Sequence, residues 1–284
     1  MADTWTIQRV LTWTSDYFKK KDLDAPRLTA EILLAHALGC DRVRLYTDYD
    51  RPLNKDELAT YRGLVDRRVK GEPTFYLTGA KEFFGHRFLV DARVLVPRPE
   101  TELLVEAALE RLPEGFEGEV LDLCTGTGCV GLSLARERAQ LKLVATDASP
   151  EALAVARANA DALQLASRVE LVQGDLFLPL GERRFDLIVA NPPYLESATL
   201  ASLAPEVRAE PRLALDGGPD GLGILRRIVL AAAGHLLPQA WLLLEIGEGQ
   251  GAPVLQMFGS AGLAEASIRK DLAGLDRIAL ARRP

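Results

Sequence analysis

The sequence has little cysteine and no long apolar run, and both shortages exclude classes of protein. Its cysteines, Cys40, Cys124 and Cys129, are too few for a disulfide framework and lack the spacing of a zinc site. No apolar stretch reaches the roughly 18–20 residues that a membrane span requires. The first residues carry neither the basic head nor the apolar core of a signal peptide. We therefore expect a cytoplasmic protein with no membrane partner.

Excess positive charge is lacking as well. The formal net charge is −6, and the hydrophobic share of 48% and the charged share of 26% are ordinary for a soluble globular protein. Nucleic-acid binding relies on a basic surface, so we expect no direct nucleic-acid partner. The histidines, His36, His86 and His235, are scattered over different predicted elements, and we assign no metal site.

The first part of the chain is predicted to be helical throughout. Apolar residues from Ile7 onward recur every three or four positions, which indicates an amphipathic helix. Pro26 is placed to open a second helix that Gly39 ends, and the pair Asn54 and Glu57 is typical of a capping box on a third. No catalytic constellation appears here. We predict that residues 1–74 form a small all-α bundle that holds a partner.

A short connecting region and a larger α/β domain are predicted to follow. Residues 82–90 form two short strands around Gly85, so we predict a β-hairpin linker over residues 75–97. Beyond it, strands and helices alternate, as in a doubly wound parallel sheet. We therefore predict a Rossmann-like seven-stranded domain over residues 98–284. Its strands are expected over residues 119–123, 141–145, 169–172, 185–190, 241–246, 264–269 and 277–281.

The stretch Asn191-Pro192-Pro193-Tyr194 follows an apolar run, 185–190, that is predicted to be a buried parallel strand. Ligands of open α/β sheets bind at the carboxyl ends of the strands, and two prolines in a row hold a stiff, extended loop. The Asn191 side-chain oxygen and the Pro192 carbonyl can then accept from a planar nitrogen with two N–H donors. Such a nitrogen belongs to an amide or an exocyclic amine, and Tyr194 can lie against its flat face. The alternative interpretation is a strand-end turn with a surface tyrosine.

Three consecutive strand ends carry residues that suit a nucleoside. The first ends in a loop whose glycines let the backbone pass close to a ligand, formed by Cys124, Thr125, Gly126, Thr127 and Gly128. Asp147, about twenty residues further on, can accept from both ribose hydroxyls. Asp175 can accept from an adenine amino group, with Leu176 and Phe177 flanking the ring. No basic residue addresses a phosphate here, which favours S-adenosyl-L-methionine over NAD. Either acid taken alone would favour a solvated surface position, and it is the three in register, each closing a consecutive strand, that favour a nucleoside site.

Further stretches complete the pattern of one protein family. They are residues 71–73, 76–79, 82–85, 96–102, 210–211, 217–222, 245–247 and 271–277. With them, the chain resembles the bacterial peptide chain release factor glutamine methyltransferases (HemK/PrmC-like) along nearly its whole length. Asn-Pro-Pro-Tyr is shared with many amino-group methyltransferases, whereas the segments 96–102 and 271–277 are far more specific. Two departures stand out: Cys124 replaces the usual glycine, and Gln239-Ala240 replaces a Pro-Gly-Gly-type turn.

The resemblance implies an S-adenosyl-L-methionine-dependent protein-glutamine N-methyltransferase that modulates translation termination. Its substrate would be the side-chain amide of the glutamine in the Gly-Gly-Gln loop of class I release factors, and its second product S-adenosyl-L-homocysteine. The N-terminal bundle would bind the release factor, and we expect a monomer. Implied catalytic and glutamine-binding residues are Asn191, Pro192, Pro193 and Tyr194. Implied cofactor contacts are Cys124, Thr125, Gly126, Thr127, Gly128, Asp147, Asp175, Leu176 and Asn191.

Other functions remain as alternatives. A ribosomal-protein glutamine methyltransferase performs the same chemistry on a different partner, but the helical bundle and the 271–277 ending favour the release factor. An adenine-specific nucleic-acid methyltransferase also uses the tetrapeptide, yet it would need a base-recognition domain and a basic groove. The sequence shows neither. A cofactor-binding module without catalysis would leave the loop at Asn191 without a purpose.

Overall fold

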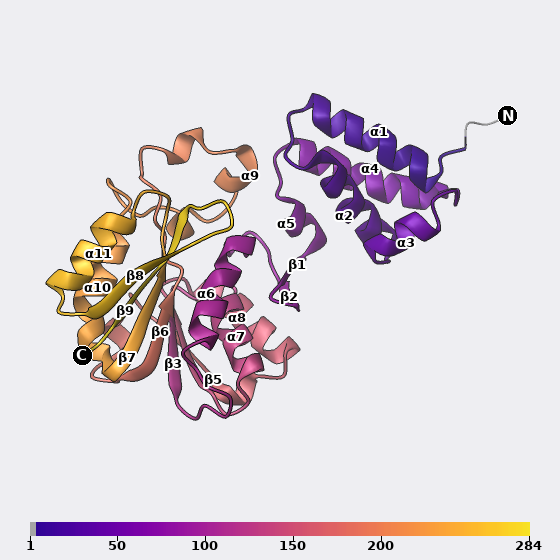
Figure 1. Ribbon diagram of the computed structural model, residues 1–284. Coiled ribbons are helices and arrows are strands. Elements are labelled where there is room, and N and C mark those ends of the chain that lie inside the picture. The colour runs from indigo at the N-terminus through magenta and orange to yellow at the C-terminus, as the bar shows by residue number, and fades with distance from the viewer. Residues whose placement is uncertain (1–3) are drawn as a thin grey trace. The chain divides into compact units, whose positions relative to one another are not determined.

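The computed structural model describes residues 4–284, which divide into two compact units (Figure 1). The first unit comprises the chain up to Ala80 together with Ala204–Ala209, and the second comprises Lys81–Leu203 and Glu210–Pro284. Residues 1–3 lie outside the described residues, so the expectation that the first residues form no signal peptide falls partly outside the structure. Among the helices of residues 4–284, none is both long enough and apolar enough to cross a membrane.

The first unit is helical, as predicted. The helices predicted at Ile7, at Pro26 and after Asn54 are confirmed, and Gly39 ends the second in the left-handed conformation. The Asn54 side chain accepts from the Glu57 N–H while the Glu57 side chain accepts from the Asn54 N–H, which confirms the capping box. The helices are α1 (Ile7–Lys20), α2 (Pro26–Leu38), α3 (Arg42–Thr47), α4 (Lys55–Val69), α5 (Thr74–Thr78) and α9 (Pro205–Arg208). The three shorter helices, α3, α5 and α9, were not predicted, because one or two turns show no clear periodicity.

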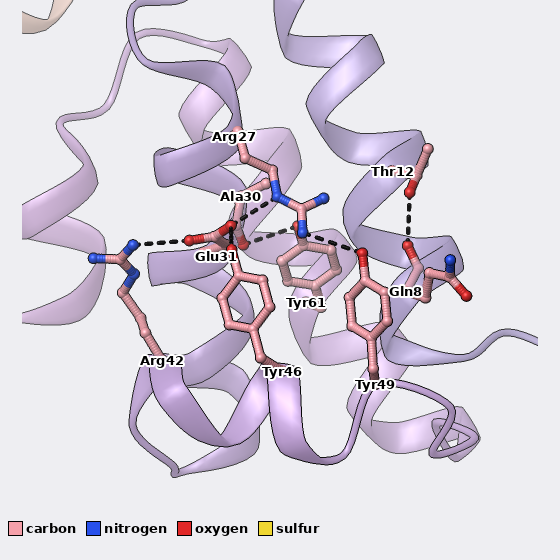
Figure 2. A network of polar contacts seen from close by, with 9 residues as sticks. All are labelled: Gln8, Thr12, Arg27, Ala30, Glu31, Arg42, Tyr46, Tyr49 and Tyr61. Atoms are coloured by element: carbon pink, nitrogen blue, oxygen red, sulfur yellow. Dashed lines mark hydrogen bonds and ion pairs between the residues drawn. The ribbon is translucent and has the colours of Figure 1, made fainter.

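A buried carboxylate lies inside this bundle (Figure 2). Glu31 of α2 is 2% exposed. It accepts from Arg27 at 2.7 Å and from Arg42 at 2.8 Å, and the Tyr46 hydroxyl also donates to it. A carboxylate is tolerated in a core only when it is paired and hydrogen-bonded, and these donors fulfil both conditions.

The second unit begins with the predicted hairpin, formed by β1 (Ala80–Phe83) and β2 (His86–Leu89). Phe84 and Gly85 form its turn with φ of 48° and 72°, the signs that a tight two-residue hairpin turn requires. Asn159 is fully buried, accepts from the Leu89 N–H at 2.7 Å and donates to the Leu89 carbonyl at 3.2 Å. The hairpin is thereby fixed to the helix that carries Asn159.

A seven-stranded sheet forms the centre of the second unit, in the order β5-β4-β3-β6-β7-β9-β8. The strands β5, β4, β3, β6 and β7 run parallel, as predicted, whereas β9 is antiparallel to both of its neighbours. A short turn joins β8 to β9, and such a turn cannot return a strand in the parallel direction. The strands are β3 (Glu119–Leu123), β4 (Lys142–Asp147), β5 (Val169–Gln173), β6 (Phe185–Ala190), β7 (Leu236–Glu245), β8 (Ala264–Lys270) and β9 (Asp276–Arg282).

Helices cover both faces of this sheet (Figure 1). Alternate residues of each strand face opposite sides, so Val120 joins the apolar cluster on one face and Leu121 the cluster on the other. The first cluster is covered by α6 (Glu102–Leu109), which follows the short η1 (Pro99–Thr101), and by α7 (Cys129–Glu137) and α8 (Pro150–Ala162). The second is covered by α10 (Gly223–His235) and α11 (Gly251–Ser260). The strand order changes direction between β3 and β6, which is where such sheets bind ligands.

Candidate functional site

A pocket lies at the carboxyl ends of β3, β4, β5 and β6, and most of the predicted site residues line it. Among the lining residues are Cys124, Thr125, Gly126, Thr127, Asp147, Asp175, Leu176, Asn191 and Pro193. Gly128, Pro192 and Tyr194 were also predicted, but they are not part of the lining. The four loops converge because parallel strands end at one edge of the sheet, although their residues lie far apart in the sequence.

The loop after β3 is held in a tight turn by its own backbone. Gly126 and Gly128 have φ of 55° and 80°, which glycine adopts without strain. A Cβ at Gly128 would lie 2.8 Å from a methyl of Leu132, so a larger residue there would require the Leu132 side chain to shift. The Thr125 hydroxyl and the Gly131 N–H donate to Asp122 at 2.7 and 3.0 Å. Burial raises the pKa of Asp122 to about 7, despite these two hydrogen bonds.

Asp147 stands at the end of β4, beside this loop. Its Oδ2 accepts from the Gly126 N–H and its Oδ1 from the Ser149 N–H, both at 2.9 Å. Burial raises its pKa, and the backbone donors oppose that rise. Both oxygens are thus oriented by fixed backbone groups at the wall of the pocket.

The third acid, Asp175, is exposed at the pocket rim and pairs with Arg227 at 2.6 Å. Leu176 is buried, has a φ of 51° and faces the same pocket. Phe177 is not among the lining residues, contrary to the expectation that it flanks an adenine. Instead it stacks on His235 with ring centres 4.5 Å apart, because it belongs to the apolar cluster beneath the sheet. Sequence reasoning missed Ile224 of α10, which lines the pocket and which no motif singles out.

The loop after β6 is tied down at both ends of its tetrapeptide. The Nδ2 of Asn191 donates to Oγ1 of Thr101 at 3.2 Å, and the Tyr194 hydroxyl donates to Oε1 of Glu245 at 3.3 Å. Gln250 donates to the Tyr194 carbonyl at 2.9 Å. Thr101, Glu245 and Gln250 were not predicted as site residues. Thr101 and Glu245 belong to motif stretches of the resemblance, which was the available signal for them.

The Tyr194 side chain is oriented toward Glu245. Burial, with the nearby Glu245 carboxylate, raises the pKa of the Tyr194 hydroxyl, which therefore stays protonated and a donor. Glu245 is 1% exposed. Burial raises its pKa to about 7, while hydrogen bonds from Thr101 and Tyr194 act in the opposite direction.

The charge of the pocket wall suits a ligand with a cationic centre. Asp122, Asp147 and Asp175 line it, against a single cation, Arg93. Arg93 is itself paired with Asp91 at 2.6 Å. A phosphate would meet net negative charge here, whereas hydroxyl groups, an amino group and a sulfonium would find acceptors. The residues present therefore fit S-adenosylmethionine.

Family models and curated proteins show which family the chain is similar to. The model of the PrmC N-terminal domain matches residues 9–79, and that of the methyltransferase small domain matches residues 99–217. A release factor glutamine methyltransferase of Geobacter sulfurreducens is 48% identical over 277 residues, covering 97% of this chain and 96% of that protein. A protein of the same name from Cereibacter sphaeroides is 46% identical over 263 residues, covering 92% and 93%.

Solved structures confirm the predicted fold. A methyltransferase from Pyrococcus furiosus superposes with a TM-score of 0.54 at 20% identity, covering 72% of this chain and 91% of that one. A T. thermophilus 16S rRNA methyltransferase in complex with AdoMet and guanosine gives a TM-score of 0.51 at 21% identity, covering 72% and 50%. At these identities the likeness concerns the fold, a Rossmann-like methyltransferase sheet.

Proposed function

Because this chain belongs to the release factor glutamine methyltransferase family, we propose that it methylates the side-chain amide of the glutamine in the Gly-Gly-Gln loop of class I peptide chain release factors. The observation that carries the proposal is the placement of Asn191. Asn191 lines the pocket that holds the acids of β4 and β5, and its Nδ2 donates one of its two N–H groups to Thr101. The Asn191 oxygen is therefore the branch left to accept from a substrate amide.

The β3, β4 and β5 ends supply the groups that would hold the methyl donor. Asp147 would accept from the ribose hydroxyls, Asp175 from the adenine amino group, and Leu176 would contact the ring. The loop from Cys124 to Gly128 would approach the donor through its backbone. S-adenosylmethionine, when bound, supplies a methyl group that its sulfonium sulfur already activates.

The loop after β6 then has to place and polarise a poor nucleophile. An amide nitrogen is weakly nucleophilic because its lone pair is delocalised into the carbonyl. Its two N–H groups would donate hydrogen bonds to the Asn191 oxygen and the Pro192 carbonyl. These bonds would draw electron density onto the nitrogen as positive charge develops. The rigid prolines hold both acceptors in place, so that alignment supplies much of the rate. The surplus amide proton leaves after transfer, and no side chain has to serve as a general base.

The two compact units correspond to two tasks in this proposal. The helical unit contains no constellation of catalytic groups among its described residues, and it would recognise the body of the release factor. The second unit would bind the glutamine and the methyl donor. We further propose that the protein acts as a monomer in the cytoplasm, where its substrate is found.

The proposal is tested by transfer of labelled methyl from S-adenosylmethionine to a purified class I release factor. A copy of that factor with the loop glutamine changed to alanine is the matched control. We expect label on the first and none on the second. Label on neither, with binding of S-adenosylmethionine intact, would instead place the substrate among ribosomal proteins or nucleic acids.

A further inference from the structure

The Asn191 carboxamide is tied at one branch to a buried threonine. Its Nδ2 donates to Oγ1 of Thr101 at 3.2 Å, and Thr101 is 1% exposed. A carboxamide carries two donors on its nitrogen and an acceptor on its oxygen. The direction of this one hydrogen bond therefore decides whether the pocket meets an acceptor or a donor.

A threonine hydroxyl cannot impose that direction by itself. It offers one donor and two acceptor sites, so an unconstrained Thr101 could equally donate to the Asn191 oxygen, with the carboxamide turned around. The observed direction is enforced only if the Thr101 proton is held by another group.

Glu245, at the end of β7, is the group that can hold it. The carboxylate is 1% exposed, and the Thr101 hydroxyl lies next to it, where it acts as a hydrogen-bonding neighbour that lowers the carboxyl pKa. The Tyr194 hydroxyl donates to its Oε1 at 3.3 Å, while Oε2 is buried with no hydrogen-bond partner within residues 4–284. An ionised carboxylate only accepts hydrogen bonds. The Thr101 hydroxyl therefore donates to it, and the Thr101 oxygen is left to accept from Asn191.

We propose that Glu245 and Thr101 are positioning residues that fix the polarity of the Asn191 carboxamide, with its oxygen facing the substrate amide. The inference rests on the proposed function and adds to it the residues that keep the Asn191 oxygen directed at the substrate. A neutral Glu245 donates to Thr101 instead, and the freed Thr101 proton can bond to the Asn191 oxygen. The carboxamide then presents its NH2 group to the substrate N–H groups, and donors face donors.

The surroundings of Glu245 place this change near neutral pH. Burial raises the pKa of Glu245 to about 7, and Glu100 adds to the rise. Thr101, Tyr194 and the Arg277 guanidinium of β9 lower it. Further charged and titratable neighbours are Asp271, which pairs with Arg277 at 2.9 Å, and the Cys129 thiol of α7. Glu245 is ionised above about pH 7, so methyl transfer is expected to rise as the pH increases through that value.

The asparagine side chains give a readout that does not depend on activity. Asn54, Asn159 and Asn191 are the only asparagines of the chain, so labelling asparagine with nitrogen-15 yields few side-chain amide signals. Loss of a signal in Asn191→Ala identifies that of Asn191. We expect this signal to titrate with a midpoint near pH 7 in the full chain. The titration should be absent in Glu245→Gln and in Thr101→Val, and it should persist in Thr101→Ser.

Turnover provides the second readout. Thr101→Val should lower kcat by about 10- to 100-fold, as loss of an outer hydrogen-bond partner does at other sites. The dissociation constant of S-adenosylmethionine should stay within about twofold of the wild-type value, and Thr101→Ser should recover most of kcat. Thr14→Val is the matched control, since Thr14 is equally buried but lies in the helical unit beside Tyr61.

The outcomes separate this inference from the proposed function. An Asn191 signal that does not titrate, or that titrates unchanged in Thr101→Val and Glu245→Gln, overturns the inference even if release factor is methylated. A wild-type chain that leaves release factor unmethylated overturns the proposed function, while the titration still decides the polarity of Asn191. Binding of S-adenosylmethionine serves as the test of folding. If one of Glu245→Gln, Thr101→Val and Thr101→Ser fails to bind it, the other two of these variants decide whether the inference holds.

Discussion

Oδ2 of Asp147 accepts a hydrogen bond from the Gly126 N–H at 2.9 Å, which joins the end of β4 to the glycine loop after β3. The Ser149 N–H holds the other oxygen at the same distance. Each carboxylate oxygen retains a further acceptor site. Asp147 is thus an oriented acceptor at the pocket wall, as the proposed ribose contact requires.

Substitution of Asp147 should therefore weaken binding of S-adenosylmethionine. Hydrogen bonds to a charged group contribute about 1.5–3 kcal/mol, so Asp147→Ala should raise the dissociation constant by about 10- to 100-fold. Calorimetric titration with S-adenosylmethionine measures this. Asp161→Ala, which removes an exposed carboxylate of the adjacent helix α8, is the control. An unchanged dissociation constant in Asp147→Ala would remove Asp147 from the ribose role.

Loss of the Asn191 side chain should affect the reaction far more than the binding of S-adenosylmethionine. Asn191→Ala removes the acceptor proposed for the substrate amide, and the loss of one such preorganised group costs about 100- to 1,000-fold in kcat. Binding of S-adenosylmethionine should be largely preserved, because the acids of β4 and β5 are untouched. Turnover with release factor, measured beside calorimetry, checks both parts. Turnover that survives the substitution contradicts the proposed role.

Neutralising Glu31 should destabilise the helical unit (Figure 2). In Glu31→Gln the guanidinium groups of Arg27 and Arg42 lose their charged acceptor. Their side chains are 36% and 49% exposed and can turn toward water. The expected loss is therefore about 2–3 kcal/mol, below the usual cost of breaking a fully buried pair. Denaturant unfolding measures it. Asp48→Asn, which breaks the exposed pair with Arg44, should cost less than about 1 kcal/mol.

The same carboxylate should make stability depend on acid pH. Burial acts to raise the pKa of Glu31, but hydrogen bonds from Tyr46, Arg42 and Arg27 outweigh it and lower the pKa. Its contribution is fully present above the unfolded-state pKa, about 4.3, and is lost as pH falls through the lower folded-state pKa. Unfolding experiments in this acid range should show a steeper decline in the wild type than in Glu31→Gln. Parallel curves would contradict the prediction.

Both departures from the family's glycines place a side chain in the left-handed region. Cys124 and Gln239 have φ of 57° and 67°. Gln239 is exposed and its hydrogen bonds to Arg282 and Arg283 run through its backbone, so glycine would keep them. Glycine relieves the strain of the left-handed conformation but increases the conformational entropy of the unfolded chain. Because the first effect is larger, Gln239→Gly should stabilise the protein by about 0.5–1 kcal/mol.

The control for this substitution is Gln256→Gly, in the exposed face of α11. There the helical conformation suits glutamine, and glycine should cost about 0.5–1 kcal/mol. Thermal unfolding compares the two variants. If Gln239→Gly loses as much stability as Gln256→Gly, strain at Gln239 is not the dominant effect.

Local patterns predicted most of the elements. The capping pair Asn54 and Glu57, the stop at Gly39 and the turn at Gly85 each depend on neighbours within a few residues, and all three were confirmed. The short helices α3, α5 and α9 were missed because they are too brief to show a period. The antiparallel direction of β9 was missed because it depends on which strands β9 pairs with, and hydrophobic periodicity gives no information on pairing.

The sequence by itself determined the alternation of strands and helices, the loops that follow β3 and β6, and the acids that end β4 and β5. Only the tertiary structure decided which side chains meet. Phe177 stacks on His235 and does not line the pocket. Thr101 accepts from Asn191, which is distant in the sequence, and both Thr101 and Tyr194 lie beside Glu245. The physical reason is that periodicity and turn chemistry act between near neighbours. Hydrogen bonds between buried groups, by contrast, exist only after the sheet has brought its strand ends to one edge.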